Sequence, residues 1–479
     1  MESNHHNFSV TSISKSDPPP SSAGLLQAKP WQAAMIGLGT AATQLDTAVN
    51  IAFPAITRGF DLSIGNIQWV VICYVLTYAS LLLALGRIGD TIGHALVFRI
   101  GLIWSTVALL LVGWSPSFGA MLFFRFLQGI GAALVLSCGA ALVTSLYGEA
   151  RRSHALGIYT MMLSVGLMLG PLLGGALTSA WDWPSVFWFR IPIAVAALLL
   201  LRGMRAPPQR QAADRFDVPG GIALVLGLVT MLLALNRMRE FSAVWFALLS
   251  AAAFAAFIFR ESRAARPIIA VEILKDPGFA LLNLVSVLVN LAAFSVWLLV
   301  PYFLARVPGY SLTESGAILA TAAAGAALAA PIGGRLTGRR ISARRLAIAG
   351  AAANGVGLLL LGAWTEQTPT ILRIAGLVVQ GVGLGLFQLA YSDIVTAALP
   401  LRDRGVAGSL VLLTRTLGTV TAASVIFLVF EILNMKYGFL EGFQKTFQLA
   451  ALLAFAAAGS SALSPRRIDD KPNSETGLE

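Results

Sequence analysis

The sequence predicts an all-α membrane protein with fourteen transmembrane helices, and two observations indicate this fold class. The composition is 57% hydrophobic and 12% charged, roughly half the charged fraction of an ordinary soluble chain. Apolar runs of bilayer-crossing length, about 20 residues each, also follow one another along the chain with only short gaps between them. We therefore expect a polytopic membrane protein with no separate soluble domain.

Fourteen apolar runs are predicted to cross the membrane as helices. They cover residues 31–55, 66–86, 95–114, 118–145, 153–178, 184–203, 218–236, 243–260, 279–305, 314–334, 344–363, 371–397, 406–432 and 445–463. Residues 1–30 are polar and rich in Ser and Pro, and residues 464–479 have a similar character. We interpret both segments as disordered cytoplasmic tails.

The basic residues predict how the chain sits in the membrane. The net charge is +11, which in a soluble protein would indicate nucleic acid. Here Lys and Arg concentrate in alternate short loops, the pattern of loops that stay in the cytoplasm. We expect a bacterial inner (plasma) membrane protein with both termini in the cytoplasm, with the lipid bilayer as a partner and no nucleic acid.

The two cysteines predict neither a disulfide framework nor a metal site. Cys73 and Cys138 both lie in apolar runs. The histidines show no metal-ligand spacing. We expect no metal and no cofactor.

A weak internal repeat predicts two similar halves. The segment LALGRIGDTIGH (83–94) is similar to PIGGRLTGRRIS (331–342), about 248 residues further on. This spacing fits a parallel repeat of two six-helix bundles, at 31–203 and 279–463, with two inserted helices at 218–260. In the first copy we expect a tight turn with Asp90 capping a helix across the gap, as a conformational latch. A plain turn is the alternative, and the residues of this gate are Gly86, Asp90, Gly93 and His94.

The fifth span, GIYTMMLSVGLMLGPLLGGAL (157–177), carries a run of glycines. Gly166, Gly170 and Gly174 recur every four residues and so share one helix face, where another helix can approach closely. Pro171 removes a backbone donor and predicts a kink. We expect this face, with Gly175 beside it, to seal the interface between the bundles; a fixed structural crossing is the alternative.

The first span contains a carboxylate at mid-membrane depth. Asp46 shares a helix face with Thr43, Thr47 and Asn50. A carboxylate there is costly unless it is protonated, paired or facing water, so it indicates function. We predict that Asp46 is the proton carrier; a structural polar cap is the alternative.

In the fourth span, RFLQGIGAA begins with Arg125, which stays charged and must find an acceptor. Asp46 is the predicted partner, so that the pair forms a switchable proton site. A fixed salt bridge that only joins two helices is the alternative.

The second half contributes polar and aromatic residues that we assign to a substrate cavity. Asn290, Phe294 and Trp297 share a face of the ninth span with Asn283. An apolar cavity with a few polar anchors suits lipophilic ligands, although helix packing alone explains the aromatics equally well. Arg415 also needs an acceptor, either Asp393, Tyr391 or helix carbonyls, and Asp393 is the alternative proton carrier. The predicted substrate residues are Thr43, Asn50, Gln68, Tyr74, Asn290, Phe294, Trp297, Gln380, Phe387, Gln388 and Tyr391.

Together these segments resemble the fourteen-span drug:proton antiporters of the major facilitator superfamily, over about residues 31–463. The similar segments are LDTAVNIAFPAI (45–56), IQWVVICYVL (67–76), GRIGDTIGH (86–94), RFLQGIGAA (125–133), GLMLGPLLGG (166–175) and RGVAGSLVLLTRTLG (404–418). The resemblance implies alternating access and proton-driven export of small lipophilic or amphiphilic compounds.

The sequence departs from the family pattern at several positions. Thr91, His94 and Ala95 stand where basic residues are usual, which implies a weaker or pH-dependent latch, and Gly338 stands where an acid is common in the second copy. Arg190 replaces the usual Asn, which puts the outer gate in doubt and would favour anionic or amphiphilic substrates.

Two other functions were weighed. A transporter of one metabolite or of a lipid fits the same fold, because fold does not determine substrate. An intramembrane enzyme is disfavoured, because the spans contain no paired carboxylates, metal triad or Ser–His constellation. A channel is disfavoured because it would not need the kinked, Gly-rich fifth span between the bundles. We expect a monomer.

Overall fold

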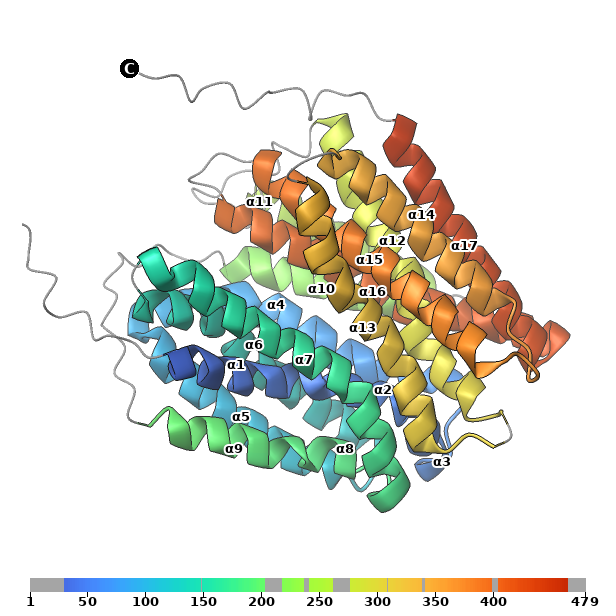
Figure 1. The fold of residues 1–479 in the computed structure, drawn as a ribbon, viewed down its shortest axis with the longest axis horizontal. Coiled ribbons are helices and arrows are strands. Elements are labelled where there is room, and N and C mark those ends of the chain that lie inside the picture. The colour runs from blue at the N-terminus through green and yellow to red at the C-terminus, as the bar shows by residue number, and fades with distance from the viewer. Residues whose placement is uncertain are drawn as a thin grey trace, which may run out of the picture.

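The computed structural model describes residues 30–147, 149–202, 218–236, 241–261, 276–307, 309–337, 341–398 and 404–463, and all regular structure there is helical (Figure 1). Apart from Pro30, the residues of the predicted tails lie outside these ranges. In chain order the elements are α1 (Pro30–Gln44), the 3-10 helix η2 (Leu45–Thr47), α2 (Ala48–Ile51), α3 (Phe53–Gly59), the 3-10 helix η3 (Ile64–Ile67), α4 (Gln68–Ile92), α5 (His94–Gly113), α6 (Phe118–Leu146), α7 (Glu149–Trp181), α8 (Ser185–Trp188), α9 (Arg190–Leu200), α10 (Val218–Asn236), α11 (Ser242–Glu261), α12 (Pro277–Leu304), α13 (Leu312–Thr337), α14 (Ala343–Gly362), α15 (Thr370–Ala398), α16 (Arg404–Tyr437) and α17 (Phe439–Leu463).

Ten helices in the described residues are long and apolar enough to cross a membrane. They correspond to ten of the predicted spans, and the chain is therefore a polytopic helical membrane protein. The other four predicted spans fall on α1 to α3, on α8 and α9, on α10 and on α17. The total of fourteen crossings stays a prediction.

The helices form two groups that lie against each other (Figure 1). Helices α1 to α9, which we call the amino-terminal half, occupy the lower part of the view, and α12 to α17, the carboxy-terminal half, occupy the upper part. Within the first half α1 packs on α7 and α6 on both α4 and α5, while in the second half α15 packs on α13 and α14. We call the end where α1 begins the inner end, and the end where α7 ends the outer end.

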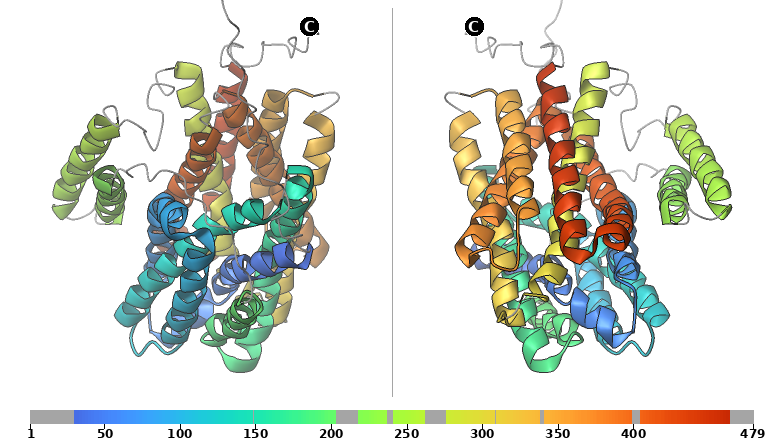
Figure 2. Two further views of the ribbon diagram at one scale, coloured as in Figure 1. Left: turned by 90° about the vertical axis from the view of Figure 1, so that its left-hand side faces the viewer. Right: turned by 90° about the vertical axis from the view of Figure 1, so that its right-hand side faces the viewer.

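The inserted helices α10 and α11 form a hairpin at the side of the molecule (Figure 2). They pack on each other, and the Ser250 hydroxyl donates a hydrogen bond to the Gly227 carbonyl at 2.9 Å. α10 also contacts α4 in one half and α16 in the other. The hairpin therefore lies beside the seam between the halves.

The predicted turn over residues 86–94 is much shorter in the structure. Gly86 to Ile92 continue α4 as helix, and α5 begins at His94. Gly93 alone separates the two helices, with a φ of +101° that a residue with a side chain rarely adopts. The prediction of a turn from Gly86 onward was wrong, because a single left-handed glycine is enough to reverse the chain.

The glycine face of α7 does not meet the other half, contrary to our expectation. A side chain at Gly166 would meet the Ala41 carbonyl, one at Gly170 would meet Thr47, and one at Gly174 would meet the Ala48 carbonyl. All three contacts are with the first span, in the same half. The helix continues through Pro171 without a break.

The contact between the halves at the outer end uses other residues of α7. A side chain at Gly175 would meet the Leu312 carbonyl, and one at Gly316 of α13 would meet the Pro171 carbonyl. The Thr57 and Tyr302 hydroxyls also hydrogen-bond across the seam at 2.6 Å. Small residues let the backbones of α7 and α13 touch here, so α7 packs on the first span with one face and on the opposite half with another.

A bulky residue at position 175 should hold the outer ends apart. We expect Gly175→Val to slow cross-linking of Thr57→Cys to Tyr302→Cys by a short bifunctional thiol reagent roughly fivefold or more, since overpacking costs about 1–3 kcal/mol. The measurement is the rate of this cross-linking in a background in which Cys73 and Cys138 are Ser. Gly157→Val is the matched control on the same helix, because a side chain at Gly157 meets no atom within 4 Å. Equal cross-linking in both variants would show that Gly175 does not hold this contact.

Candidate functional site

A cavity of about 380 Å³ lies between the two halves. This volume is within the usual range for small-molecule sites, about 300–1,000 Å³. The first span, α4, α6 and α7 line it from one side, and α12, α13, α15 and α16 from the other. Leu82, Tyr159 and Leu412, which lie towards the inner end, also line it, so the cavity lies on the inner side of the α7–α13 contact.

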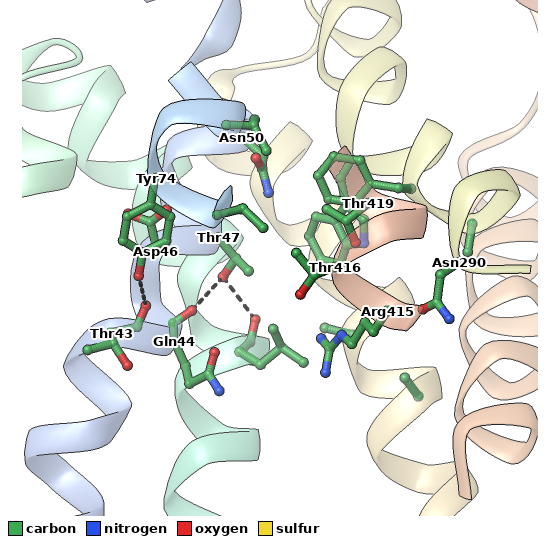
Figure 3. A pocket seen from close by; sticks show the side chains of 18 of the residues that line it. Thr43, Gln44, Asp46, Thr47, Asn50, Tyr74, Asn290, Arg415, Thr416 and Thr419 are labelled. Atoms are coloured by element: carbon green, nitrogen blue, oxygen red, sulfur yellow. Dashed lines mark hydrogen bonds between the residues drawn. The ribbon is translucent and has the colours of Figure 1, made fainter. Parts of the chain in front are cut away.

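The first span reaches the cavity with a helix that changes pitch. Between α1 and α2 the chain forms the 3-10 helix η2, which contains Asp46. The Thr47 hydroxyl donates to the carbonyls of Gln44 and Leu167, both at 3.2 Å. These bonds fix the segment to its own helix and to α7. The polar residues of the first span that line the cavity are Thr43, Gln44, Asp46, Thr47 and Asn50 (Figure 3).

Asp46 accepts hydrogen bonds from three side chains on two other helices. Arg125 binds it through both terminal nitrogens, Nη1 to Oδ1 at 2.7 Å and Nη2 to Oδ2 at 2.9 Å. Gln128 Nε2 donates to Oδ1 at 3.0 Å, and Arg190 Nη1 donates to Oδ1 at 2.8 Å. The structure thus brings Asp46 to its predicted partner, Arg125, and adds a second guanidinium.

Two members of this cluster, Gln128 and Arg190, were not predicted as partners of Asp46. Arg190 was described only as a departure from a family pattern, with no predicted acceptor. Its side chain is 1% exposed, at the start of α9. The signal was present, because the rule that a buried arginine must find an acceptor applies to Arg190 as it does to Arg125.

Aromatic rings and a backbone carbonyl hold the arginines in place. The Arg125 guanidinium carbon lies 4.3 Å from the centre of the Tyr74 ring, and the Arg190 carbon lies 5.5 Å from that of Phe187. Arg125 Nε donates to the Val70 carbonyl at 3.0 Å. Cation–π contacts and charge-assisted hydrogen bonds together fix the orientation of both cations.

The cluster carries a formal charge of plus one, because two guanidinium groups share one carboxylate. Its stability depends on that carboxylate, since the interior screens charge poorly and the two cations repel each other. A proton on Asp46 would remove the acceptor that holds both arginines. The arrangement can therefore convert a protonation event into the release of two helices, α6 and α9, from the first span.

The wall formed by the carboxy-terminal half is mostly apolar with a few amides. Phe294 and Trp297 line the cavity, as do Asn290, Gln380 and Gln388. Gln388 Nε2 donates to Asn290 Oδ1 at 3.2 Å, and Gln380 Nε2 donates to Asn354 Oδ1 at 2.9 Å. Eight of the predicted substrate residues therefore line one cavity: Thr43, Asn50, Tyr74, Asn290, Phe294, Trp297, Gln380 and Gln388.

Three other predicted substrate residues lie elsewhere. Gln68 is buried at the start of α4. Phe387 stacks on Tyr391 with ring centres 5.9 Å apart, and the Tyr391 hydroxyl donates to Asn283 Oδ1 at 2.8 Å. Phe387 and Tyr391 pack in the core of their own half, so assigning them to the cavity was wrong.

Arg415 and Asp393 do not form the pair that the sequence suggested. Arg415 lines the cavity from α16, and Asp393 is exposed on α15 and does not line it. Among the described side chains no hydrogen bond or ion pair involves Arg415. Tyr391, the other suggested acceptor, bonds Asn283 and Thr414 instead.

The predicted latch is only partly visible. His94 is buried where α5 begins, next to Gly89 and Cys138. The Asp90 side chain and residues 338–340 of the second copy lie outside the described set, so the latch stays a prediction. In the described ranges no three His, Cys, Asp or Glu side chains group as a metal site would require.

A sequence model of the Major Facilitator Superfamily matches residues 35–269 and 282–477. Multidrug resistance protein Stp of Mycobacterium tuberculosis (strain ATCC 25618 / H37Rv) is 29% identical over 400 residues, which cover 81% of this chain and 74% of the relative. Cephamycin export protein CmcT of Amycolatopsis lactamdurans is 31% identical over 387 residues, covering 78% and 79%. Riboflavin transporter RibZ of Clostridioides difficile (strain 630) is 26% identical over 385 residues, covering 80% and 84%.

A solved structure shows the same fold. It is a bacterial homologue of the human lysosomal transporter Spinster, in an inward-facing and unoccupied conformation. The TM-score is 0.68 at 20% identity, over 92% of this chain and 97% of that chain.

The carboxylate cluster predicts a specific pattern of stability changes. Asp46→Asn leaves two buried cations without a counter-charge and should cost about 3–5 kcal/mol of unfolding free energy. Arg190→Gln leaves both hydrogen bonds between Arg125 and Asp46 in place, so it should lower the unfolding free energy by less than Asp46→Asn does. The double variant Asp46→Asn/Arg190→Gln should lose less unfolding free energy than Asp46→Asn alone, because one of the two unpaired cations is removed together with the carboxylate.

Denaturation in mixed micelles measures these differences. Asp182→Asn is the matched control, since Asp182 lies exposed at the outer end and its carboxylate accepts, among the described residues, from the Trp183 backbone N–H at 2.7 Å. If the double variant were no more stable than Asp46→Asn, Arg190 would not depend on that carboxylate.

Proposed function

The chain belongs to the Major Facilitator Superfamily, so it is a membrane transporter and not an enzyme, and we propose that it exports small lipophilic or amphiphilic compounds in exchange for protons. The observation that carries this proposal is Asp46, 14% exposed, shared by Arg125 and Arg190 on the wall of a cavity between the halves. Relatives named for multidrug resistance or antibiotic export support the export direction.

The proposed cycle uses the cavity and the outer contact in turn. The halves touch at the outer end through α7 and α13, while the cavity lies on the inner side of that contact. This arrangement suits a carrier that is closed to the outside and loads substrate from the inside. After the halves rock about the cavity, the outer contact opens and the substrate leaves.

Protonation of Asp46 is the proposed coupling step. In the outward-open carrier Asp46 takes a proton and loses its hold on Arg125 and Arg190. The change weakens the cluster that ties η2 to α6 and α9, and we propose that this favours substrate release and the return to the inward-open state. Inside, the proton leaves and the cluster forms again.

The proposed setting is a bacterial inner membrane, with fourteen helices, both termini in the cytoplasm and a single chain as the working unit. The positive-inside pattern of the loops supports this orientation.

Transport of one specific metabolite is the second candidate function. The similarity to a protein named as a riboflavin transporter favours it, at 26% identity over 80% of this chain. The two candidates differ in breadth, so uptake of a panel of unrelated compounds into everted vesicles separates them. Export of several unrelated compounds supports the broad exporter, and export of one supports the metabolite transporter.

Asp46→Asn should uncouple transport from protons. The variant resembles the protonated state permanently, so we expect gradient-driven export to fall to background while downhill exchange of substrate continues. The measurement is proton movement, followed with a pH-sensitive dye in proteoliposomes when substrate is added, at equal amounts of reconstituted protein.

Asp393→Asn is the matched control, because Asp393 lies outside the cavity. Proton movement at the wild-type rate in Asp46→Asn, together with its loss in Asp393→Asn, would transfer the coupling role to Asp393.

A further inference from the structure

We propose that the cavity selects amphiphiles with an anionic group, such as a carboxylate or a sulfonate, and that Arg415 binds this group. The inference rests on the proposed function, because it concerns the substrate of the same cavity. It goes beyond that function by specifying the charge of the substrate and the side chain that binds the charged group.

The first step is the charge of the cavity wall. Among the described residues that line it, Asp46 is the one carboxylate, and Arg125 and Arg415 are the cations. Arg190 lies behind the wall and also binds Asp46. Three guanidinium groups against one carboxylate leave a formal excess of two positive charges. Arg415 is exposed, whereas Arg125 and Arg190 are buried. An excess of positive charge around one cavity attracts an anion and disfavours a cation.

The second step is that the Asp46 carboxylate already accepts hydrogen bonds from protein side chains. Oδ1 of Asp46 accepts from Arg125, Gln128 and Arg190, and Oδ2 accepts from Arg125. A cationic substrate would have to displace these donors while facing two guanidinium groups. Asp46 is therefore poorly placed to receive a cationic substrate while it is ionised.

The third step is Arg415 itself. It projects from α16 into the cavity and faces the wall formed by Gln44 and Thr47 (Figure 3). Within the part of the chain that the structure describes, it has no hydrogen-bond or ion-pair partner. A guanidinium presents a planar fork of donors that matches the two oxygens of a carboxylate or sulfonate.

The fourth step is a second donor beside it. Thr416 also lines the cavity, its side chain is 98% buried, and its hydroxyl has no hydrogen-bond partner among the described residues. A buried hydroxyl without a partner is rare in native proteins and calls for a ligand or a water molecule. Figure 3 shows both side chains on the same stretch of α16. Together they offer donors to a ligand that is rich in acceptors.

The fifth step is the apolar part of the ligand. Phe294 and Trp297 of α12, Leu384 of α15 and Leu163 of α7 line the same cavity. An aromatic or aliphatic body can lie against these side chains while its anionic group reaches Arg415. The cavity thus fits an amphiphile whose charge is at one end.

Three compounds with one ring system test the charge preference. These are 2-naphthoate, 2-naphthamide and naphthyltrimethylammonium, titrated into the full-length protein in detergent at pH 7.5 and followed by calorimetry. We expect naphthoate to bind about tenfold to a hundredfold more tightly than the amide, the usual range for a hydrogen bond to a charged group. The ammonium compound should bind most weakly.

Variants assign the preference to Arg415. In Arg415→Gln we expect naphthoate to bind no more tightly than the amide, while amide binding changes less than threefold, and Arg415→Lys should recover part of the preference. Arg306→Gln is the matched control, since Arg306 packs on Phe439 at the outer end and does not line the cavity. If the amide or the ammonium compound binds wild-type protein as tightly as naphthoate, or if Arg415→Gln keeps the full preference, the inference is wrong.

Vesicle transport separates this inference from the proposed function. Naphthoate that binds through Arg415 but is never exported, with or without a proton gradient, would contradict the proposed export and leave the binding site standing. Export that favours the ammonium compound would support the transporter and overturn the anion site.

Discussion

The Asp46 carboxylate is the constraint on which the rest of this structure depends, because a charge buried in the membrane interior is costly unless it is paired or faces water. Its pairing joins η2 to α6 through Arg125 and to α9 through Arg190. The next residue, Thr47, bonds the backbone of α7 and lies where a side chain at Gly170 would be. Five residues further along α7, Gly175 touches the other half. A single helix therefore connects the surroundings of the carboxylate to the contact between the halves.

The distribution of charge has an energetic meaning for the proposed exchange. Moving one elementary charge across a membrane potential is worth about 2.3 kcal/mol per 100 mV. An anion that leaves a cell and a proton that enters it both move down an inside-negative potential. The surplus of guanidinium groups around the cavity would thus suit a substrate whose exit the potential already favours. The separation of Asp46 on one wall from Arg415 on the other also leaves proton and substrate on different halves.

The sequence predicted which side chains belong to the site better than it predicted what those side chains contact. Charges in apolar runs identified Asp46 and Arg125, because few partners exist at that depth. The same rule predicts an acceptor for Arg190, but no pattern in the sequence says which acceptor a buried cation reaches. Helical periodicity correctly placed Gly166, Gly170 and Gly174 on one helix face, but it does not show what that face packs against. Tertiary packing decides this, and the three glycines face the first span of their own half. In the same way Phe387 and Tyr391 lie in the core of their own half rather than in the cavity.

The assembly of the Asp46 cluster has a consequence for the synthesis of the protein and its insertion into the membrane. Asp46 and Arg190 are 144 residues apart, so at about 5–20 residues per second the ribosome needs roughly 7–30 s to make the second arginine after the carboxylate. During this interval the first span carries an acid whose final surroundings do not yet exist. Until α9 is made, Asp46 lacks the hydrogen bond from Arg190. Biogenesis of this chain should thus depend on the order of synthesis, so that a polypeptide interrupted between α6 and α9 enters the bilayer with its electrostatic centre incomplete.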